Sequence, residues 1–547
     1  MDTKKHGRFE EILRDLATRF RLDPSAVRLM PRVLPAARTY APAIVLGVVL
    51  LAAAALRPWW TDRELWFDEA FTWRLVEFPL AEMMDRAARD NSPPLYYLLL
   101  HAWVWVFGDS LAALRGLSAL CGVLTVAGMY LFVREALEGG GARARGLALF
   151  VAALTATSVF QVRYSGEVRP YALGAALAAL SAWTLSRATR PGPPSARAWV
   201  AYGVVTLLFA YTHYYALFSV AAQAAYLAGW LLANAGWRPG AALRDPRLRY
   251  TLLAGAVVAV GWLPWLPTFL KQRAQVQAAF WAPPVGVWTL PEFCYQMFVD
   301  PQPLLPGESS HRRLAAVAVV CAAGLVALGR RARGAEWHVL LAAVGPFALG
   351  VAASKAGTQA LTLRYFLFAH LFLLAGAGIL VWRIRHAAVR HTVAAALVGV
   401  SLLVTLGFQR GLDLDSCPGA RGAAEYIAAQ RRPGEPVVAA SPLWYQPVAY
   451  HLGGRDIALY DAGGPMPHYY GTAVLRPEEM LDGRALSEVR GSRLWAVDGV
   501  GRYWGRQEVP VPGGWELVET RSFPEPLRVG RVVVRVYERR EPESSLP

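Results

Sequence analysis

The chain contains little charge for its size, since Asp, Glu, Lys and Arg make up 18% of its 547 residues while 55% are hydrophobic. A soluble protein of this length would have about 25% charged and about 45–50% apolar residues, so the composition excludes an ordinary soluble protein. Many apolar runs reach the roughly 17–25 residues with which a helix crosses a bilayer. We therefore expect a mostly α-helical, polytopic membrane protein.

Cysteine is also scarce, and its four residues show no metal-binding spacing. Cys121 and Cys321 lie inside apolar runs, where we expect them to pack against other side chains. Cys294 and Cys417 could meet on the outer side of the membrane, so the sequence leaves a disulfide between them open.

Several common sequence signatures are absent. The sequence has no GxGxxG motif, no P-loop, no internal repeat and no long low-complexity stretch. It therefore lacks the usual signatures of nucleotide binding. The N-terminus is not expected to be a signal peptide, because residues 1–38 are charged and no small-residue cleavage site follows the apolar run 41–56.

The net charge of +16 does not indicate a nucleic-acid partner, because the basic residues are spread over many short loops and not gathered on one face. Basic loops in a membrane protein usually report its topology. The loops can therefore be used to orient the chain.

Eleven apolar stretches predict membrane-spanning helices. They are 41–57, 113–133, 146–162, 170–186, 198–212, 215–233, 251–270, 314–329, 337–353, 364–382 and 392–409. A further stretch, 93–108, is short, begins with two prolines and is rich in Trp and Tyr, which favour the membrane interface.

The charge of the loops decides how this short stretch is placed. If it lies flat on the outer surface and the N-terminus is cytoplasmic, five basic loops face the cytoplasm, as the positive-inside rule requires. These loops are 134–145, 187–197, 234–250, 330–336 and 383–391. We therefore expect a cytoplasmic segment 1–40, a membrane domain 41–410 with about eleven spans and an interfacial helix, and a periplasmic domain 411–547, all in the inner membrane of a bacterium.

The C-terminal part changes character. A helix is predicted at 420–430, and short strands at 435–439, 457–460, 494–497 and 531–537, separated by Gly- and Pro-rich turns. This pattern is typical of a small α/β domain.

With this topology, the polar residues that stand in unusual places gather on the outer side. They are Asp68, Glu69, Asp90, Glu167, Arg169, His213, Tyr214, Lys271, Lys355, Arg364 and Tyr365. A carboxylate can take a proton from an acceptor hydroxyl, cations or a metal ion can hold the charge of a departing phosphate, and aromatic rings can stack on a sugar. The set predicts transfer of a sugar from a lipid carrier. No tryptophan is assigned to this site.

The motifs around these residues resemble those of a known family. F-D-E-A at 67–70, D-N-S-P-P-L-Y-Y at 90–97, Y-S-G-E-V-R-P-Y-A-L at 164–173 and L-R-Y-F at 363–366 are similar, in order and spacing, to the GT-C glycosyltransferases of the protein O-mannosyltransferase and aminoarabinose transferase type. The resemblance covers about residues 40–410. It implies a polyprenyl-phosphate sugar donor and inverting transfer to an extracytoplasmic acceptor.

The resemblance also implies roles for single residues. Asp68 would be the general base, Arg364 would bind the lipid phosphate with help from Lys355, and Glu69 would shape the site. Asp90 and Glu167 are candidate ligands of a divalent ion, the one candidate cofactor. The chain departs from some relatives at Ser92, where they have Lys or His before the two prolines.

Other interpretations stay open at this point. Asp90 could cap the helix that begins at the prolines, Glu167 and Arg169 could form a salt bridge, and His213 and Lys271 could belong to the interface. The whole chain could be a secondary transporter or lipid flippase, although the acids lie at span ends and no repeat is present. It could also be a non-catalytic envelope scaffold. The sequence names neither the sugar nor the acceptor, which could be a protein, a lipid or a polysaccharide.

Overall fold

A computed structural model describes most of the chain. The described residues are 24–57, 63–137, 141–302, 311–357, 361–454, 456–501, 505–526 and 530–540. The chain divides into two compact units, Met1–Leu51 and Ala52–Pro547. Helix α2 (Pro24–Leu56) begins in the first unit, and the second unit holds the other helices of the described residues and a C-terminal β-sheet.

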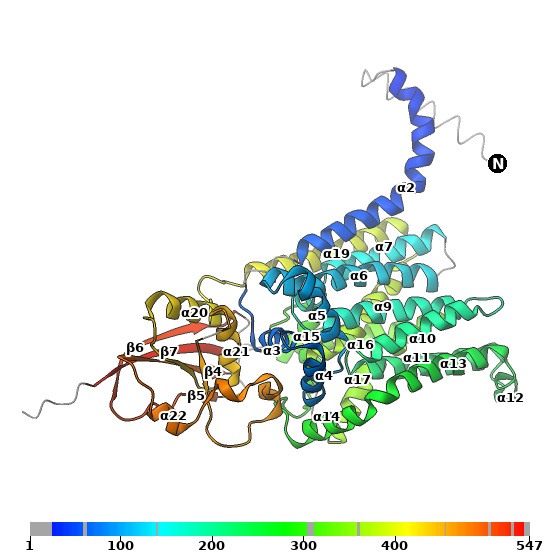
Figure 1. Ribbon diagram of the computed structural model, residues 1–547. Coiled ribbons are helices and arrows are strands. Elements are labelled where there is room, and N and C mark those ends of the chain that lie inside the picture. Colours follow the sequence, from blue (N-terminus) through cyan, green and yellow to red (C-terminus); the bar gives the residue numbers. More distant parts are fainter. Residues whose placement is uncertain are drawn as a thin grey trace, which may run out of the picture. The chain divides into compact units, whose positions relative to one another are not determined.

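The helices of the second unit follow one another along the chain (Figure 1). They are α3 (Phe67–Val76), α4 (Leu80–Arg89), α5 (Leu95–Phe107), α6 (Leu111–Ala136), α7 (Ala142–Thr157), α8 (Val159–Ser165), α9 (Tyr171–Ala188), α10 (Ala196–Ala210), α11 (Ala216–Asn234), α12 (Pro239–Ala242), α13 (Pro246–Trp262), α14 (Leu266–Ala278), α15 (Thr289–Phe298), α16 (His311–Gly329), α17 (Ala335–Lys355), α18 (Leu367–Trp382) and α19 (Ala387–Arg410). Two 3₁₀ turns, η3 (Leu263–Trp265) and η4 (Leu363–Phe366), precede α14 and α18.

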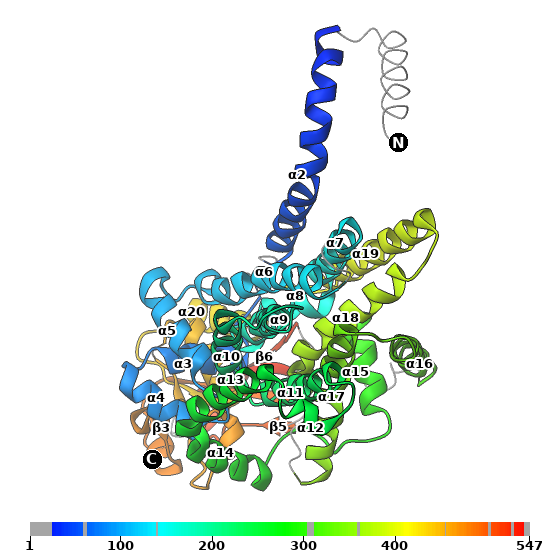
Figure 2. The ribbon, with the colours of Figure 1, turned by 90° about the vertical axis from the view of Figure 1, so that its right-hand side faces the viewer.

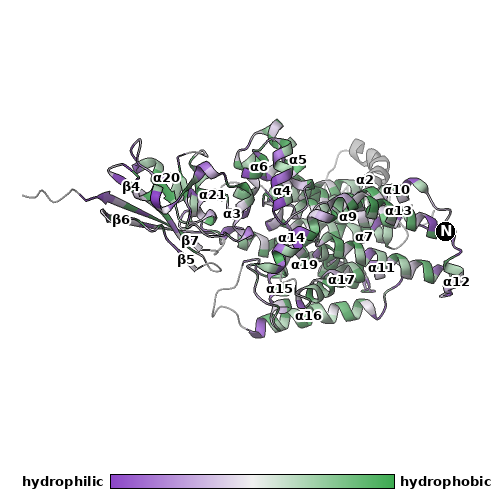
Figure 3. Ribbon diagram, turned by 60° about the horizontal axis from the view of Figure 1, so that its bottom comes forward, coloured by the Kyte–Doolittle hydropathy of each residue, from purple (hydrophilic) through white to green (hydrophobic). Residues whose placement is uncertain are grey.

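Seven helical segments in the described part of the chain are long and apolar enough to cross a membrane, and the bent pair α7–α8 would make an eighth. Figure 3 shows apolar residues along these helices. The mostly helical membrane class is confirmed. The predicted count of eleven spans stays a prediction, since Tyr40–Leu56 and α10 are shorter apolar helices. Helix α5 has 13 residues, too few for a span, as the predicted interfacial helix requires.

Small residues let the central helices approach closely. A Cβ atom on Gly128 of α6 would lie 2.9 Å from the Cβ of Ala179 on α9, and one on Gly174 would lie 2.4 Å from the ring of Phe368 on α18. Such contacts are typical of packing between membrane helices. They hold α18 beside α7 and α9 (Figure 2), so that the N-terminal ends of α9 and α18 lie near each other.

A break at Ser158 creates the turn that carries several predicted site residues. Helices α7 and α8 meet at an angle of 58°. Ser158 caps α8, because its hydroxyl accepts a hydrogen bond from the Gln161 amide. Helix α8 ends at Ser165, and the turn 166–170 then brings Val168 and Arg169 against Glu69 and Thr72 of α3.

The C-terminal part forms a seven-stranded mixed sheet. Its strands are β1 (Val437–Ala439), β2 (Ala458–Tyr460), β3 (Met480–Leu481), β4 (Arg493–Gly501), β5 (Gly505–Gln507), β6 (Trp515–Pro524) and β7 (Gly530–Arg539). The order is β3-β2-β1-β4-β7-β6, with β5 paired to β4. Strands β1 to β4 pair in parallel, and β7 is antiparallel to β4 and β6. The helix and the four strands predicted from the sequence are confirmed, within a few residues at their ends.

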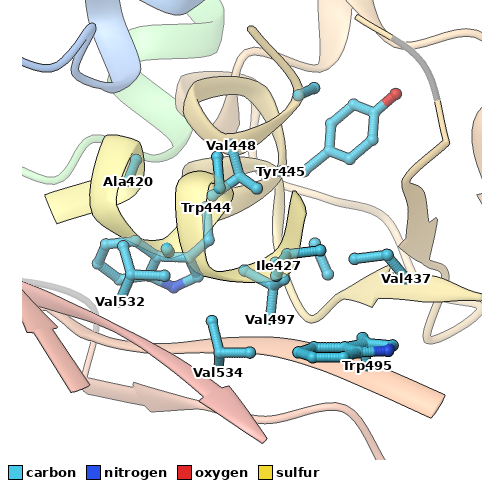
Figure 4. Close-up of a cluster of buried hydrophobic side chains, with 14 of the residues drawn as sticks. Ala420, Ile427, Val437, Trp444, Tyr445, Val448, Trp495, Val497, Val532 and Val534 are labelled. Carbon is cyan, nitrogen blue, oxygen red and sulfur yellow. The ribbon is translucent and has the colours of Figure 1, made fainter. Parts of the chain in front are cut away.

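Three described α-helices accompany this sheet, and the last of them, α22 (Gly483–Ser487), has five residues. Helix α20 (Gly419–Gln430) matches the predicted helix, whereas α21 (Pro442–His451) was not predicted. Ser441 caps α21, whose first residue is a proline. Helices α20 and α21 pack on the sheet (Figure 4), around a buried cluster that includes Trp444, Trp495 and Val534.

The cysteine pairing left open by the sequence is not formed. None of the four cysteines forms a disulfide bond. The thiol of Cys294 on α15 interacts with that of Cys321 on α16. The reason is that α15 packs directly against α16, which brings Cys294 to a partner inside the bundle.

The closest approach in the C-terminal core gives a test of this packing. A Cβ atom on Gly499 of β4 would lie 2.0 Å from Cε2 of the buried Trp444 indole. We expect Gly499→Ala to lower the free energy of unfolding by about 1–3 kcal/mol, because the indole has no space to move. Gly513→Ala is the matched control, since nothing lies within 4 Å of its Cβ position. Thermal unfolding of the two variants in detergent should show the difference, and equal melting temperatures would contradict the packing.

Candidate active site

Glu69 is a fully buried carboxylate that joins three parts of the chain. Its Oε2 lies 2.8 Å from Nη2 of Arg63 and 2.9 Å from Nη2 of Arg115 on α6, and its Oε1 accepts hydrogen bonds from Nε of Arg115 and the backbone amide of Val168. Burial raises the pKa of the Glu69 carboxyl, but the two guanidinium groups outweigh it and hold the pKa below its usual range. Glu69 therefore lies behind the site and shapes it.

Asp68, the next residue on α3, points the other way. Its carboxylate is partly exposed and lies 2.7 Å from Nη1 of Arg364 on η4. Its backbone carbonyl accepts hydrogen bonds from the Thr72 hydroxyl at 2.9 Å and from Arg169 at 3.4 Å. Neighbouring residues on a helix face different directions, so one turn of α3 carries both the buried anchor and the exposed carboxylate.

Aromatic rings surround the guanidinium of Arg364. Its central carbon lies 5.6 Å from the Trp66 ring centroid, 5.5 Å from that of Trp281 and 5.7 Å from that of Tyr171. A cation among ring faces is attracted by their quadrupoles, and the rings limit how water can reach it. Arg364 is therefore held as a positive charge in a mostly dry place.

Asp90 lies next to this pair, at the C-terminal end of α4. Burial raises the pKa of Asp90 to about 6, against the opposing effect of Arg169 and an amide of Asn91. The first turn of α5 has Pro94 at its cap position and no capping side chain. The interpretation of Asp90 as a cap of this helix is therefore wrong.

Glu167 and Arg169 do not form the salt bridge suggested by the sequence. The Glu167 carboxylate lies 3.8 Å from Nε of Arg163, whereas Arg169 donates a hydrogen bond to the Thr72 hydroxyl at 3.1 Å. Burial raises the pKa of Glu167. The turn directs the two side chains apart, with Arg169 facing Asp68.

His213, Tyr214 and Tyr365 form an aromatic group beside Arg364. The rings of His213 and Tyr365 are 4.5 Å apart, and the Tyr215 amide donates to Nδ1 of His213. Burial, with Arg169 and Arg364 nearby, lowers the pKa of His213 to about 3, so the ring is neutral. The Tyr214 hydroxyl bonds to Gln272 on α14, and Gln272 in turn donates to a carbonyl of α4.

Two of three neighbouring cavities are lined by the Asp68–Arg364 pair. An apolar cavity of about 280 Å³ is lined by residues of α11, α14 and the turn before α11, among them His213, Tyr215, Phe218, Phe269, Arg273 and Tyr365. A polar cavity of about 310 Å³ is lined by Asp68, Arg364, Trp281, Glu292, Gln296 and Tyr469, among others. A small junction of about 40 Å³ is lined by Asp68, Asp90, Arg169, Arg364, Tyr365 and Tyr469. No described residue lines both larger cavities. The junction connects them, because it shares Arg169 and Tyr365 with the apolar cavity and Asp68 and Arg364 with the polar one.

Two predicted cations lie outside these cavities. The side chains of Lys271 and Lys355 are exposed, whereas their neighbours Gln272, Arg273 and Ala353 line the apolar cavity. A phosphate role for Lys271 or Lys355 stays a prediction. Ser92, the position of the departure from relatives, lines the apolar cavity as well.

The candidate metal ligands do not gather in one place. Within the described ranges, no three His, Cys, Asp or Glu side chains come together in a way that could hold a metal ion. Asp90 lines the junction, and Glu167 lies behind it against Arg163. The described residues therefore do not fit a resident divalent ion at these two carboxylates.

Several site residues were missed by the sequence analysis. Trp66 and Trp281 face Arg364, although no tryptophan was assigned to the site. Glu292 and Gln296 of α15 and Tyr469 of the 3₁₀ turn η5 (His468–Tyr470) line the polar cavity. The Trp-Ala-Pro-Pro run at 281–284 was the one available signal, because prolines fix a loop in place.

A pair of acids joins the segment before α3 to the C-terminal domain. The Glu64 carboxylate accepts a hydrogen bond from the Ala420 amide at the start of α20. Burial and the nearby Glu525 raise the pKa of Glu64 well above its usual value, and burial raises the pKa of Glu525 to about 7. The two carboxyls therefore hold protons at a pH where exposed carboxyls have lost them.

Comparisons with known proteins identify the fold. Residues 91–265 match the family model described as dolichyl-phosphate-mannose-protein mannosyltransferase. ArnT from Cupriavidus metallidurans bound to undecaprenyl phosphate is similar with a TM-score of 0.55 and 13% identity, over 90% of this chain and 97% of that one. Its apo state gives 0.53 and 16%, over 86% and 98%.

An archaeal protein has the same architecture. The oligosaccharyltransferase AglB from Archaeoglobus fulgidus, in complex with an inhibitory peptide and a dolichol-phosphate, gives a TM-score of 0.51 and 14% identity, over 84% of this chain and 70% of that one. A search of the curated proteins finds no match. The resemblance predicted from the motifs is confirmed.

The different roles of Glu69 and Asp68 can be tested by comparing the stability of variants at the two positions. Glu69→Gln leaves the buried guanidinium groups of Arg63 and Arg115 without their anion, so we expect a loss of about 3–5 kcal/mol in the free energy of unfolding. Asp68→Asn, at a partly exposed pair, should cost far less. Thermal unfolding in detergent compares the two, and equal losses would contradict the anchoring role of Glu69.

The acid pair predicts a pH dependence. Because the pKa of Glu525 is raised in the folded chain, the folded state keeps a proton that the unfolded chain releases above about pH 4.5. Its contribution to stability is therefore complete below that pH and is lost as the pH rises toward 7 and above. At pH 8 we expect Glu525→Gln to have a higher free energy of unfolding than the unchanged protein, by up to about 3 kcal/mol. At pH 4.5 the two free energies should differ little.

The matched control for this pH dependence is Glu516→Gln on the exposed face of β6. Melting curves of all three proteins at both pH values give the comparison. A difference that does not grow with pH would contradict the assignment.

Proposed function

The chain has the fold of the GT-C glycosyltransferases, and on this basis we propose that it is a membrane enzyme that transfers a sugar from a polyprenyl-phosphate donor to an extracytoplasmic acceptor, with inversion. The observation that carries the proposal is the Asp68–Arg364 pair, which lies where an apolar and a polar cavity meet. A general base and a phosphate-binding cation are the two groups that such a transfer needs.

The apolar cavity suits the lipid half of the donor. Its walls are mostly aromatic and aliphatic, with Phe218, Phe269 and Val276 among them. Arg169 and Tyr365 line both this cavity and the junction. A polyprenyl chain in the apolar cavity would therefore place its phosphate beside Arg169 and Arg364.

The ion pair suggests how the base is released. In the free protein Arg364 neutralises Asp68. A donor phosphate next to Arg364 competes for the same guanidinium, and fork-like guanidinium groups bind phosphate strongly. Asp68 then loses its partner and becomes available to the acceptor. Donor binding would thus come before activation of the acceptor.

In the transfer step, the Asp68 carboxylate takes the proton of the acceptor hydroxyl. The hydroxyl oxygen forms a bond with the anomeric carbon while the bond from that carbon to the phosphate oxygen breaks. The electron pair leaves with the polyprenyl phosphate, whose charge Arg364 and Arg169 stabilise. Attack from the side opposite to the phosphate inverts the anomeric centre.

We also propose the orientation read from the loops, with the inner membrane as the site of action. Helix α12, in the basic loop 234–250, lies at the end of the helices opposite to the C-terminal sheet (Figure 1). The site is at the end of the helices that meets that sheet, because Tyr469 lines it. A cytoplasmic α12 therefore corresponds to a periplasmic site and C-terminal domain.

The proposal predicts a selective loss of activity. Purified protein in nanodiscs would be given radiolabelled undecaprenyl-phosphate sugars and an envelope extract. Asp68→Asn should lower transfer by about 10²–10⁴-fold, the usual contribution of a general base, while donor binding is kept. Arg364→Lys should weaken donor binding as well as transfer, because a point charge replaces the planar fork.

Leu290→Ala is a control on α15, since this side chain is exposed and lines no described cavity. Full transfer by Asp68→Asn would remove the base from the mechanism. Failure of the unchanged protein to bind or consume any donor would favour the transporter, flippase or scaffold alternatives.

A further inference from the structure

The polar cavity and the apolar cavity share no lining residue among those that the structure describes. The two share only the junction, which Asp68, Arg364 and Tyr469 line together with residues of the apolar side. An inverting displacement needs the acceptor on the side of the anomeric carbon that faces away from the phosphate. If the donor lipid occupies the apolar cavity, as proposed above, the polar cavity is where the acceptor lies.

The side chains of the polar cavity have the chemistry of carbohydrate recognition. Trp66, Trp281 and Tyr469 supply aromatic faces of the kind that stack on sugar rings. On α15, the Gln296 amide donates a 2.8 Å hydrogen bond to Oε1 of Glu292, which fixes the position of this carboxylate. A carboxylate and an amide held side by side can accept from and donate to neighbouring hydroxyl groups.

The charges in the polar cavity favour a neutral ligand. Two carboxylates, Asp68 and Glu292, and two guanidinium groups, Arg163 and Arg364, line it. Asp68 pairs with Arg364. The lining residues thus carry two negative and two positive charges, so the wall as a whole selects neither a strongly acidic nor a strongly basic acceptor.

The elements around the cavity argue against an extended peptide. The residues that line it come from helices, 3₁₀ turns, the loops 281–283 and 361–362, and Trp66 just before α3. One common way to bind a peptide in extended form is to add it as a strand to a sheet edge. No described strand of the chain contributes to this cavity, so such pairing has no partner there.

We propose that the acceptor is a carbohydrate, and that Glu292, Gln296 and Tyr469 orient its ring so that one hydroxyl meets Asp68. Glu292 and Gln296 bind hydroxyl groups from the membrane domain, while Tyr469 stacks from the C-terminal domain. This inference rests on the glycosyltransferase function proposed above and adds the class of acceptor and the residues that recognise it. These three are positioning residues, since the proton goes to Asp68.

The experiment uses the full chain in nanodiscs with a panel of radiolabelled undecaprenyl-phosphate-linked neutral sugars. The acceptors are methyl glycosides and short neutral oligosaccharides on one side, and Ser- and Thr-containing peptides on the other. Donor consumption without acceptor is measured separately, because it reports the donor half of the site alone. The variants are Glu292→Gln, Gln296→Ala and Tyr469→Ala, with Leu290→Ala as the control on the same helix.

We expect transfer to a glycoside or oligosaccharide by the unchanged protein and by the control. Each of the three variants should raise the KM for the acceptor about tenfold or more, the usual effect of losing a hydrogen bond to a charged group or a stacked ring. The KM for the donor and its slow consumption without acceptor should stay the same. A higher KM for the acceptor with an unchanged KM for the donor would not arise from a general loss of folding.

Three results would overturn the inference or its basis, and they can be told apart. Transfer to peptides and not to carbohydrates would refute the acceptor class while the proposed function stands. Transfer to carbohydrates with an unchanged acceptor KM in all three variants would refute the assigned residues. No binding or consumption of any donor would refute the proposed function itself.

Discussion

The buried ion group of Glu69 with Arg63 and Arg115 is the interaction on which the rest of the site depends. One carboxylate accepts hydrogen bonds from the segment before α3, from α6 and from the turn after α8. These segments are separated by up to about a hundred residues in the chain, and the segment before α3 and the turn after α8 carry residues of the site. Since charges buried in a dry place are costly when unpaired, the group has one stable arrangement. That arrangement sets the direction of α3 and therefore of Asp68.

The cavities follow from this framework. With α3 in place, Asp68 reaches Arg364, and the aromatic rings around Arg364 separate an apolar space from a polar one. The apolar space is lined by membrane helices and the polar space by α15 and a turn of the C-terminal domain. The proposed donor and acceptor thus approach a single ion pair from two sides. The proposed activation of Asp68 by donor binding would be a direct result of this arrangement.

Much of this could be predicted from the sequence, because hydropathy and motif order are local signals. The helices, the strands β1, β2, β4 and β7, and the residues Asp68, Arg169 and Arg364 were foreseen in this way. Strand β6 was missed because its side chains are exposed and charged, with no alternating apolar pattern. The partners of Glu69, and the roles of Trp281 and Tyr469, depend on contacts between distant segments that no local pattern records.

Helix α3 also has a consequence for how the protein is made. Phe67, the residue next to Asp68, is buried in the same cluster as Trp444 of α21 and Val532 and Val534 of β7. Strand β7 follows the described membrane helices in the chain and is therefore synthesised after them. While those helices are being inserted, some of the residues that pack around Phe67 have not yet been made. It follows that a nascent chain carries an incomplete site, which is completed only when strand β7 has joined the sheet.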